Sequence, residues 1–233
     1  MGITSKVDQE MGVRSSEGGA TMSRSIGNSD TGTAITVLRR YGGPSWPIVL
    51  SKGLFGTRAL VRQTRWGGER DEQAAFVRRL ALFPALYLQL RPRIGTEKAM
   101  DALREMMVTI GVREVNGTLQ SLPERPADPM DRLLAFAEAA GRVAPNMWFP
   151  WTLVEQTPDR LHYRITGCFV HEFFTAIGTQ ELTPLFCAID EEFFPSAFPE
   201  LDFHRDGDIA HTIGRGHPVC DFVLDRKGVG DPR

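Results

Sequence analysis

All three cysteines and all five histidines of the chain lie between His162 and Cys220. The 161 residues before His162 contain neither residue type. Cysteine and histidine are the side chains best suited to nucleophilic attack, to proton transfer near neutral pH and to the binding of soft metal ions. Their confinement predicts that the chemistry of the protein lies between Cys168 and Asp221. The competing interpretation is that the cysteines are buried packing residues, because cysteine is among the most buried residue types.

The spacing around Cys187 predicts two reactive side chains on one face of a helix. The pattern favours a helix from about residue 181 to 194, in which Cys187 and Asp190 are three positions apart. Cys168 lies where a predicted strand gives way to a predicted helix, and the N–H groups at a helix start favour a thiolate. Cys220 opens a predicted strand. The three cysteines can converge only if the helix that carries Cys187 packs on the edge of the sheet.

Two mechanisms are compatible with such a convergence. In the first, the thiolate of Cys187 or Cys168 attacks an sp² carbon, Asp190 and a histidine move protons, and water releases the product. In the second, the cysteines and a histidine hold a zinc ion that activates water. The cysteines are separated by 18 and 32 residues and form no Cys-x-x-Cys pair, so the support for zinc is weak. We expect no cofactor, with the metal ligands unassigned and zinc and iron left open.

The histidines and Arg205 differ in their expected roles. His171 opens the helix after Cys168, and His204 lies in a predicted strand beside Arg205, so both histidines are candidate site residues. Alternation along its strand predicts that His162 faces solvent, and His217 is predicted to lie in a loop. The guanidinium of Arg205 suits a substrate carboxylate, although a solvated charge beside neighbouring aspartates is an equally good interpretation.

The elements that must position these residues follow a blockwise order. Residues 152–168 alternate around a turn and predict a hairpin, and extended runs at 200–204 and 221–226 predict a second one. Elements arranged in this order predict an α+β fold: an antiparallel sheet of about four strands from two hairpins, covered by helices, with a helical N-terminal half. The expected helices are 71–90 with a kink at Pro84, 96–110 capped by Thr96 and stopped by Gly111, 131–143, 169–178 and 181–194.

The N-terminal region is expected to begin with irregular structure. Residues 1–34 are rich in Gly, Ser and Thr and predict a disordered tail, and residues 35–50 predict extended segments or a loop. The expected divisions are this tail, a helical part over 35–127 and an α+β part over 128–227, with the last two forming one continuous domain. The aromatic segment 146–151 is predicted to be a hydrophobic hinge.

Composition narrows the class of partner. The formal net charge is −2 and the pI is near 6.2, so no basic excess favours a nucleic-acid partner. No apolar run approaches the roughly 18 residues of a membrane span, and no secretory signal is visible. Three cysteines favour a reduced, cytoplasmic protein rather than a disulfide framework. We therefore expect neither a nucleic-acid partner nor a membrane partner, and the oligomeric state stays open.

Several short motifs carry a resemblance to a known family. They are Cys168 after a strand, Cys187-x-x-Asp190 on a helix, Phe203-x-Arg205, and a closing Gly216-x-x-x-Cys220-Asp221-Phe222. With these motifs the C-terminal half resembles the L-2-amino-thiazoline-4-carboxylic acid hydrolase family. The resemblance implies a small cytoplasmic hydrolase that opens a cyclic C–N bond, as in a thiazoline, a lactam or another cyclic amide. It also implies a small-molecule substrate that bears a carboxylate.

Such a reaction needs a nucleophile, an acid for the leaving nitrogen and donors for the developing negative charge. Cys187 or Cys168 would serve as the nucleophile, Asp190 with His171 would move protons, and backbone amides near Cys168 would hold the charge. Cys220 completes the predicted catalytic set, and Arg205 and His204 form the predicted substrate-binding set.

Two other classes of protein stay open. The order of strands and helices with a late Gly-x-x-x-Cys is also similar to the vinyl-reductase-like small-molecule-binding domains, which would make the protein a sensory module. That alternative predicts a closed apolar pocket and cysteines that tolerate substitution. A protein with a cysteine-ligated metal is the third class.

Overall fold

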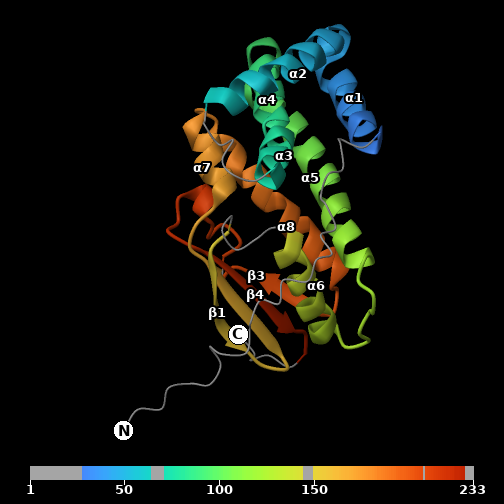
Figure 1. Ribbon diagram of the computed structural model, residues 1–233, viewed down its shortest axis with the longest axis vertical. Coiled ribbons are helices and arrows are strands. Elements are labelled where there is room, and N and C mark those ends of the chain that lie inside the picture. Colours follow the sequence, from blue (N-terminus) through green and yellow to red (C-terminus); the bar gives the residue numbers. More distant parts are fainter. Residues whose placement is uncertain (1–27, 64–70, 144–148, 207, 229–233) are drawn as a thin grey trace.

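The computed structural model describes residues 28–63, 71–143, 149–206 and 208–228. Helices α1–α4 lie toward one end of the molecule and the sheet lies at the other, with α5 and α8 running between them (Figure 1). The helices are α1 (Asn28–Gly42), α2 (Trp46–Gln63), α3 (Asp71–Leu80), α4 (Leu82–Ile94), α5 (Thr96–Gln120), α6 (Pro129–Val143), α7 (Phe169–Ala176) and α8 (Thr183–Ala197), with 3-10 turns η2 (Gly43–Ser45), η3 (Gln180–Leu182) and η4 (Ile213–Arg215). The strands are β1 (Trp151–Gln156), β2 (Arg160–Ile165), β3 (Leu201–His204) and β4 (Cys220–Arg226).

The four strands form one antiparallel sheet in the order β1-β2-β4-β3. The expected α+β class, with two antiparallel pairs and a helical N-terminal region, is confirmed. Residues directly opposite one another in an antiparallel pair point to the same face. Tyr163 lies opposite Phe222 and Ile165 lies opposite Cys220, so these side chains share the face that packs on α8. His162 and Asp221 therefore point to the other face.

Two hydrophobic clusters are joined by the α5–α8 pair. One lies among α1–α5, α7 and the start of α8, and the other lies between the ends of α5 and α8, α6 and the sheet. The two helices approach closely at Gly111, where an added Cβ would lie 2.3 Å from Ile189 Cδ1. The expectation that Gly111 ends its helix is wrong, because α5 continues to Gln120. This glycine admits the side chain of the neighbouring helix instead of stopping its own.

The N-terminal expectations are wrong in three places. Residues 35–50 are helical rather than extended, with a tight connection at Gly43, whose φ is +50°. Helix α1 begins at Asn28, inside the segment expected to be disordered, and residues 1–27 lie outside the described part of the chain. The expected helix 71–90 is interrupted at Ala81 and not at Pro84. Pro84 lies in the first turn of α4, where proline is tolerated. Buried contacts in α1, such as Val37 and Leu38, outweigh the weak local signal.

The remaining elements follow the expected order. The first hairpin, α6, α7, α8 and the strands β3 and β4 begin and end within a few residues of their expected positions. Residues 146–148 of the aromatic segment lie outside the described residues, and Trp151 belongs to β1. Within the ranges given above, no helix has the length and apolar character needed to cross a membrane.

Candidate active site

Helix α7, helix α8 and strand β4 bring the three cysteines close together. Cys168 precedes α7 and caps it, with its Sγ accepting a hydrogen bond from the His171 backbone N–H at 3.4 Å. Cys187 lies in the first half of α8, and its thiol donates to Thr212 Oγ1 at 3.7 Å. Cys220 opens β4 and accepts a hydrogen bond from the Ile213 backbone N–H at 3.0 Å. The packing of α8 on the sheet, on which the convergence depended, is therefore present.

Burial keeps the thiols neutral. Loss of solvation raises the pKa of Cys168 to about 12 and the pKa of Cys187 to about 11, and it also raises the pKa of Cys220. A negative charge on Cys187 or Cys220 would raise the pKa of Cys168 further, as expected for neighbouring thiols. The thiolate expected at the start of α7 is disfavoured, because burial raises the pKa of Cys168 by more than the hydrogen bond from the His171 N–H lowers it.

Arg205 is the least exposed charged group of this region. Its residue is 1% exposed, and its Nη2 donates to Asp190 Oδ2 at 3.1 Å. The guanidinium carbon lies 4.3 Å from the ring centre of Phe222 and 5.3 Å from that of Phe203, so aromatic faces hold the cation. Nε and Nη1 of Arg205 are buried and have no hydrogen-bond partner in the part of the chain that the structure describes. The interpretation of Arg205 as a solvated charge is therefore wrong.

Two opposing effects act on the pKa of Asp190. Burial raises its pKa, and the neighbouring Arg205 opposes this increase. Asp190 lies three residues after Cys187 on α8, and its negative charge contributes to the raised pKa of that thiol. Burial also raises the pKa of Tyr163, whose ring stacks on Phe222 with centres 5.0 Å apart. Tyr163 therefore carries a neutral hydroxyl near the Arg205–Asp190 pair.

His171 is joined to the start of α8. Its Nδ1 lies 3.2 Å from the hydroxyl of Thr183, which is fully buried. The loop before β4 also packs tightly on this helix turn. A Cβ at Gly214 would lie 2.7 Å from Thr183 Cγ2 and 3.3 Å from Cys187 Sγ. Gly214 thus lets the backbone approach the Cys187 thiol closely.

His204 is not brought into this cluster. His204, the last residue of β3, lies opposite Val223 on the far face of the sheet. Arg205 follows the strand, and its contacts with Phe222 and Asp190 place its guanidinium on the side of α8. His204 Nε2 lies 2.9 Å from Asp225 Oδ2. His162 also lies on the far face, 2.7 Å from Asp221 Oδ1, and is only 7% exposed, so the prediction that it faces solvent is wrong. His217 is exposed in a loop, as expected.

Four contacts of the cluster were not predicted from the sequence: Tyr163, Thr183, Thr212 and Gly214. Strand alternation places Tyr163 on one face with Ile165, but the register with β4 is needed to place it beside Phe222. The two threonines carry no motif, and their complete burial is a tertiary property. Among the described residues, no group of three His, Cys, Asp or Glu side chains is arranged to hold a metal ion.

Comparison with known proteins assigns the chain to a family. The sequence model of the L-2-amino-thiazoline-4-carboxylic acid hydrolase family matches residues 75–224. The chain belongs to this family. The match runs from α3 to β4 and includes α4 and α5. It therefore also includes the cysteine–arginine cluster, which consists of Cys168, Cys187, Asp190, Arg205 and Cys220.

The other comparisons add little to this assignment. No curated protein matches the chain. The crystal structure of the Fe(II) unliganded H-NOX protein from K. algicida is 13% identical, with 80% of this chain and 98% of that chain covered. Its TM-score of 0.31 is too low to support any inference about this member of the hydrolase family.

Proposed function

We propose that the protein is a hydrolase that opens a cyclic C–N bond in a small substrate bearing a carboxylate. The observation that carries this proposal is Arg205, buried with two donors unpaired next to Asp190. An unsatisfied buried donor costs free energy, and a carboxylate accepts two parallel hydrogen bonds from a guanidinium. The family to which the chain belongs supports hydrolysis, and the compound in the name of that family carries such a carboxylate.

Substrate binding would create the base that the free protein lacks. When the substrate carboxylate engages Arg205, the guanidinium stabilises the Asp190 carboxylate less. Since burial already raises the pKa of Asp190, its affinity for a proton then increases. Cys187 lies three residues away on the same helix, so Asp190 can accept the thiol proton as the sulfur attacks.

The bond changes follow from this transfer. The Cys187 Sγ–H proton moves to Asp190, and a bond forms between Sγ and the sp² carbon of the ring. The electrons of the cleaved C–N bond go to the ring nitrogen, which takes the proton back from Asp190. Water then attacks the same carbon, gives one proton to His171, and releases the Cys187 sulfur, which takes that proton. The cycle consumes one water and needs no other reactant.

The other predicted residues support this route. Cys168 is the alternative nucleophile, since it is the most exposed of the three thiols and also lies beside His171. Cys220 holds the loop before β4 by accepting the Ile213 N–H, which places Gly214 against Cys187. We propose a cytoplasmic enzyme that acts on a small molecule without a bound cofactor.

The test is turnover of L-2-amino-thiazoline-4-carboxylate, followed by mass spectrometry of the products, with 2-aminothiazoline as the substrate that lacks the carboxylate. We expect turnover of the first compound only, loss of turnover in Cys187→Ala, and a raised KM in Arg205→Gln. His211→Gln, in an exposed loop, is the matched control and should be unchanged. Full activity in both Cys187→Ala and Cys168→Ala would overturn the thiol mechanism.

A binding module is the second candidate, because the unpaired donors of Arg205 would equally serve a carboxylate that is bound and not transformed. In that case calorimetry would detect Arg205-dependent binding of the thiazoline carboxylate without product. The cysteine variants would then bind as tightly as the unchanged protein.

A further inference from the structure

Helix α2 carries a basic face that the proposed reaction does not use. The helix contains Lys52, Arg58 and Arg62 and no acidic residue, in a chain of net charge −2. Arg58 and Arg62 line an open groove together with Arg78 of α3, and all three residues are exposed. Within the described ranges, none of these three arginines has an ion-pair partner. The groove therefore offers three positive charges to an anion.

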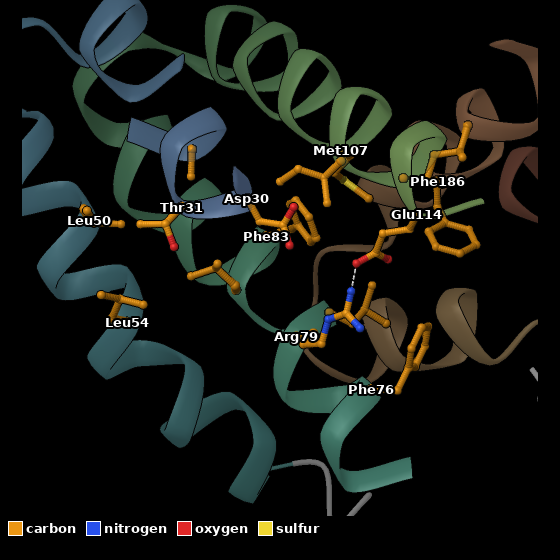
Figure 2. Close-up of a pocket in the computed structure, with 16 residues that line it drawn as sticks. Asp30, Thr31, Leu50, Leu54, Phe76, Arg79, Phe83, Met107, Glu114 and Phe186 are labelled. Carbon is orange, nitrogen blue, oxygen red and sulfur yellow. Dashed lines mark ion pairs between the residues drawn. The ribbon is translucent and has the colours of Figure 1, made fainter. Parts of the chain in front are cut away.

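An apolar pocket adjoins this groove. Leu54 and Leu82 line both, so the two spaces share a wall. The pocket lies among α1–α5 and α8 and has a volume of about 200 Å³. Figure 2 shows Phe83, Met107 and Phe186 around it. A cavity of about 150 Å³ holds benzene, so this pocket has room for an aliphatic chain of about eight carbons.

The charged groups of the pocket are already neutralised. Arg79 forms an ion pair with Glu114, drawn as a dashed line in Figure 2. Asp30 forms an ion pair with Arg113. Burial lowers the pKa of Arg79, and the charge of Asp30 opposes this decrease. Because these pairs leave no net charge at the pocket wall, a charged head group would find its partners in the groove rather than in the pocket.

We infer that the groove and the pocket together bind a free aliphatic carboxylic acid of about eight carbons. The chain enters the pocket past Leu54 and Leu82, and the carboxylate stays outside with Arg58, Arg62 and Arg78. Guanidinium groups suit this head, since each can donate two hydrogen bonds to a carboxylate. The apolar space is recessed among helices, which fits a single chain taken from solution. This site is separate from the cysteine–arginine cluster, so the inference does not depend on the proposed hydrolysis.

The first experiment is isothermal titration calorimetry of the full chain with octanoate, below the concentration at which octanoate forms micelles. We expect saturable binding of one molecule. Butanoate, which has a shorter chain, and 1-octanol, which lacks the charge, should each bind at least tenfold more weakly. Octylammonium should not bind. Equal affinity for octanoate, octanol and octylammonium, or no binding of octanoate, would overturn the inference.

Two sets of variants locate the carboxylate and the aliphatic chain of the bound acid. The triple variant Arg58→Gln/Arg62→Gln/Arg78→Gln should weaken octanoate binding at least tenfold. Lys98→Gln/Arg104→Gln/Arg125→Gln removes the same charge from exposed sites elsewhere and should not. Ala34→Phe, which fills the pocket, should abolish binding, whereas Ala59→Phe on the exposed face of α2 should not. Leu50→Phe fills the pocket from α2 and replaces Ala34→Phe if circular dichroism shows that this variant is unfolded. Undiminished binding in the filled variants would contradict the placement of the chain.

A membrane surface is the competing occupant, because Ile48 and Phe55 on α2 are exposed beside its basic residues. Sedimentation with phosphatidylglycerol vesicles tests it. Arginine-dependent sedimentation without octanoate binding would assign the basic face to anionic lipid and overturn the inference. Octanoate binding without sedimentation would support it.

Discussion

Two arginine–carboxylate pairs lie in the two regions that α8 borders, and their environments differ. Arg205 and its partner Asp190 have side chains 1% and 31% exposed, and two of the arginine donors are unpaired. Arg79 and its partner Glu114 have side chains 22% and 37% exposed, and they lie in the wall of an apolar pocket. The first cation depends on one carboxylate and has capacity for another anion. Arg79 is partly solvated and is already paired with Glu114. A ligand carboxylate is therefore expected at Arg205 and not at Arg79.

The largest expected effect is the removal of Asp190. Asp190→Ala leaves the buried guanidinium of Arg205 without an ionic partner, which should lower the free energy of unfolding by about 3–5 kcal/mol. The double variant Arg205→Met/Asp190→Ala should recover most of that loss, because no buried charge remains. Urea denaturation measures both variants, and equal stability of the single and double variants would contradict the dependence of Arg205 on Asp190.

The helix pair between the two regions gives the next effect. Gly111→Ala places a Cβ 2.3 Å from Ile189 Cδ1, so overpacking should destabilise the protein by about 1–3 kcal/mol. Gly117 is a matched control on the same helix, because it has nothing within 4 Å of an added Cβ. Gly117→Ala should instead stabilise the protein by about 0.4–1 kcal/mol, through a smaller loss of chain entropy on folding. Thermal denaturation of the two variants should therefore show shifts of opposite sign.

A pH profile tests the electrostatics of the cysteine side. Because burial raises the pKa of Cys187 to about 11, its iodoacetamide alkylation should be slow at pH 7 and should rise about tenfold per pH unit up to pH 9 or 10. Asp190→Asn removes a charge that disfavours the thiolate, so it should increase the rate at pH 8 several-fold. Peptide mass spectrometry reads each cysteine separately, with the exposed Asp208→Asn as the control. Slower alkylation of Cys187 in the Asp190→Asn variant would show that the Asp190 carboxylate does not raise the pKa of the Cys187 thiol.

The smallest effect is expected on the pocket side. Glu114→Ala breaks a partly exposed pair, and solvent screens both charges, so the free energy of unfolding should fall by no more than about 1 kcal/mol. The comparison with Asp190→Ala is internal to one protein and uses the same denaturation assay. A loss at Glu114 as large as the loss at Asp190 would remove the distinction between the two pairs.

The agreement between sequence and structure depends on how local each signal is. The hairpin before Cys168, the helix with Cys187 and Asp190, and the strand that begins at Cys220 were all predicted, because alternation and helical spacing are properties of a few adjacent residues. The N-terminal helices α1 and α2 were missed, since Gly42, Gly43 and Pro44 suggest a loop and the buried partners of Val37 and Leu38 are distant in sequence. Local sequence likewise predicts a helix end at Gly111, because Ile189, the side chain that requires glycine there, belongs to α8 and is distant in sequence.

The sequence by itself determined which residues could do chemistry and which of them share a helix face, as Cys187 and Asp190 do. It also placed His204 in a strand with Arg205 directly after it, but it did not show which of the two side chains faces the core. Only the tertiary structure decided that Arg205 faces α8 with two unpaired donors, that His204 and His162 face away, and that the thiols are neutral. These outcomes depend on burial and on the register of β2, β3 and β4, which are set by contacts between residues far apart in the chain.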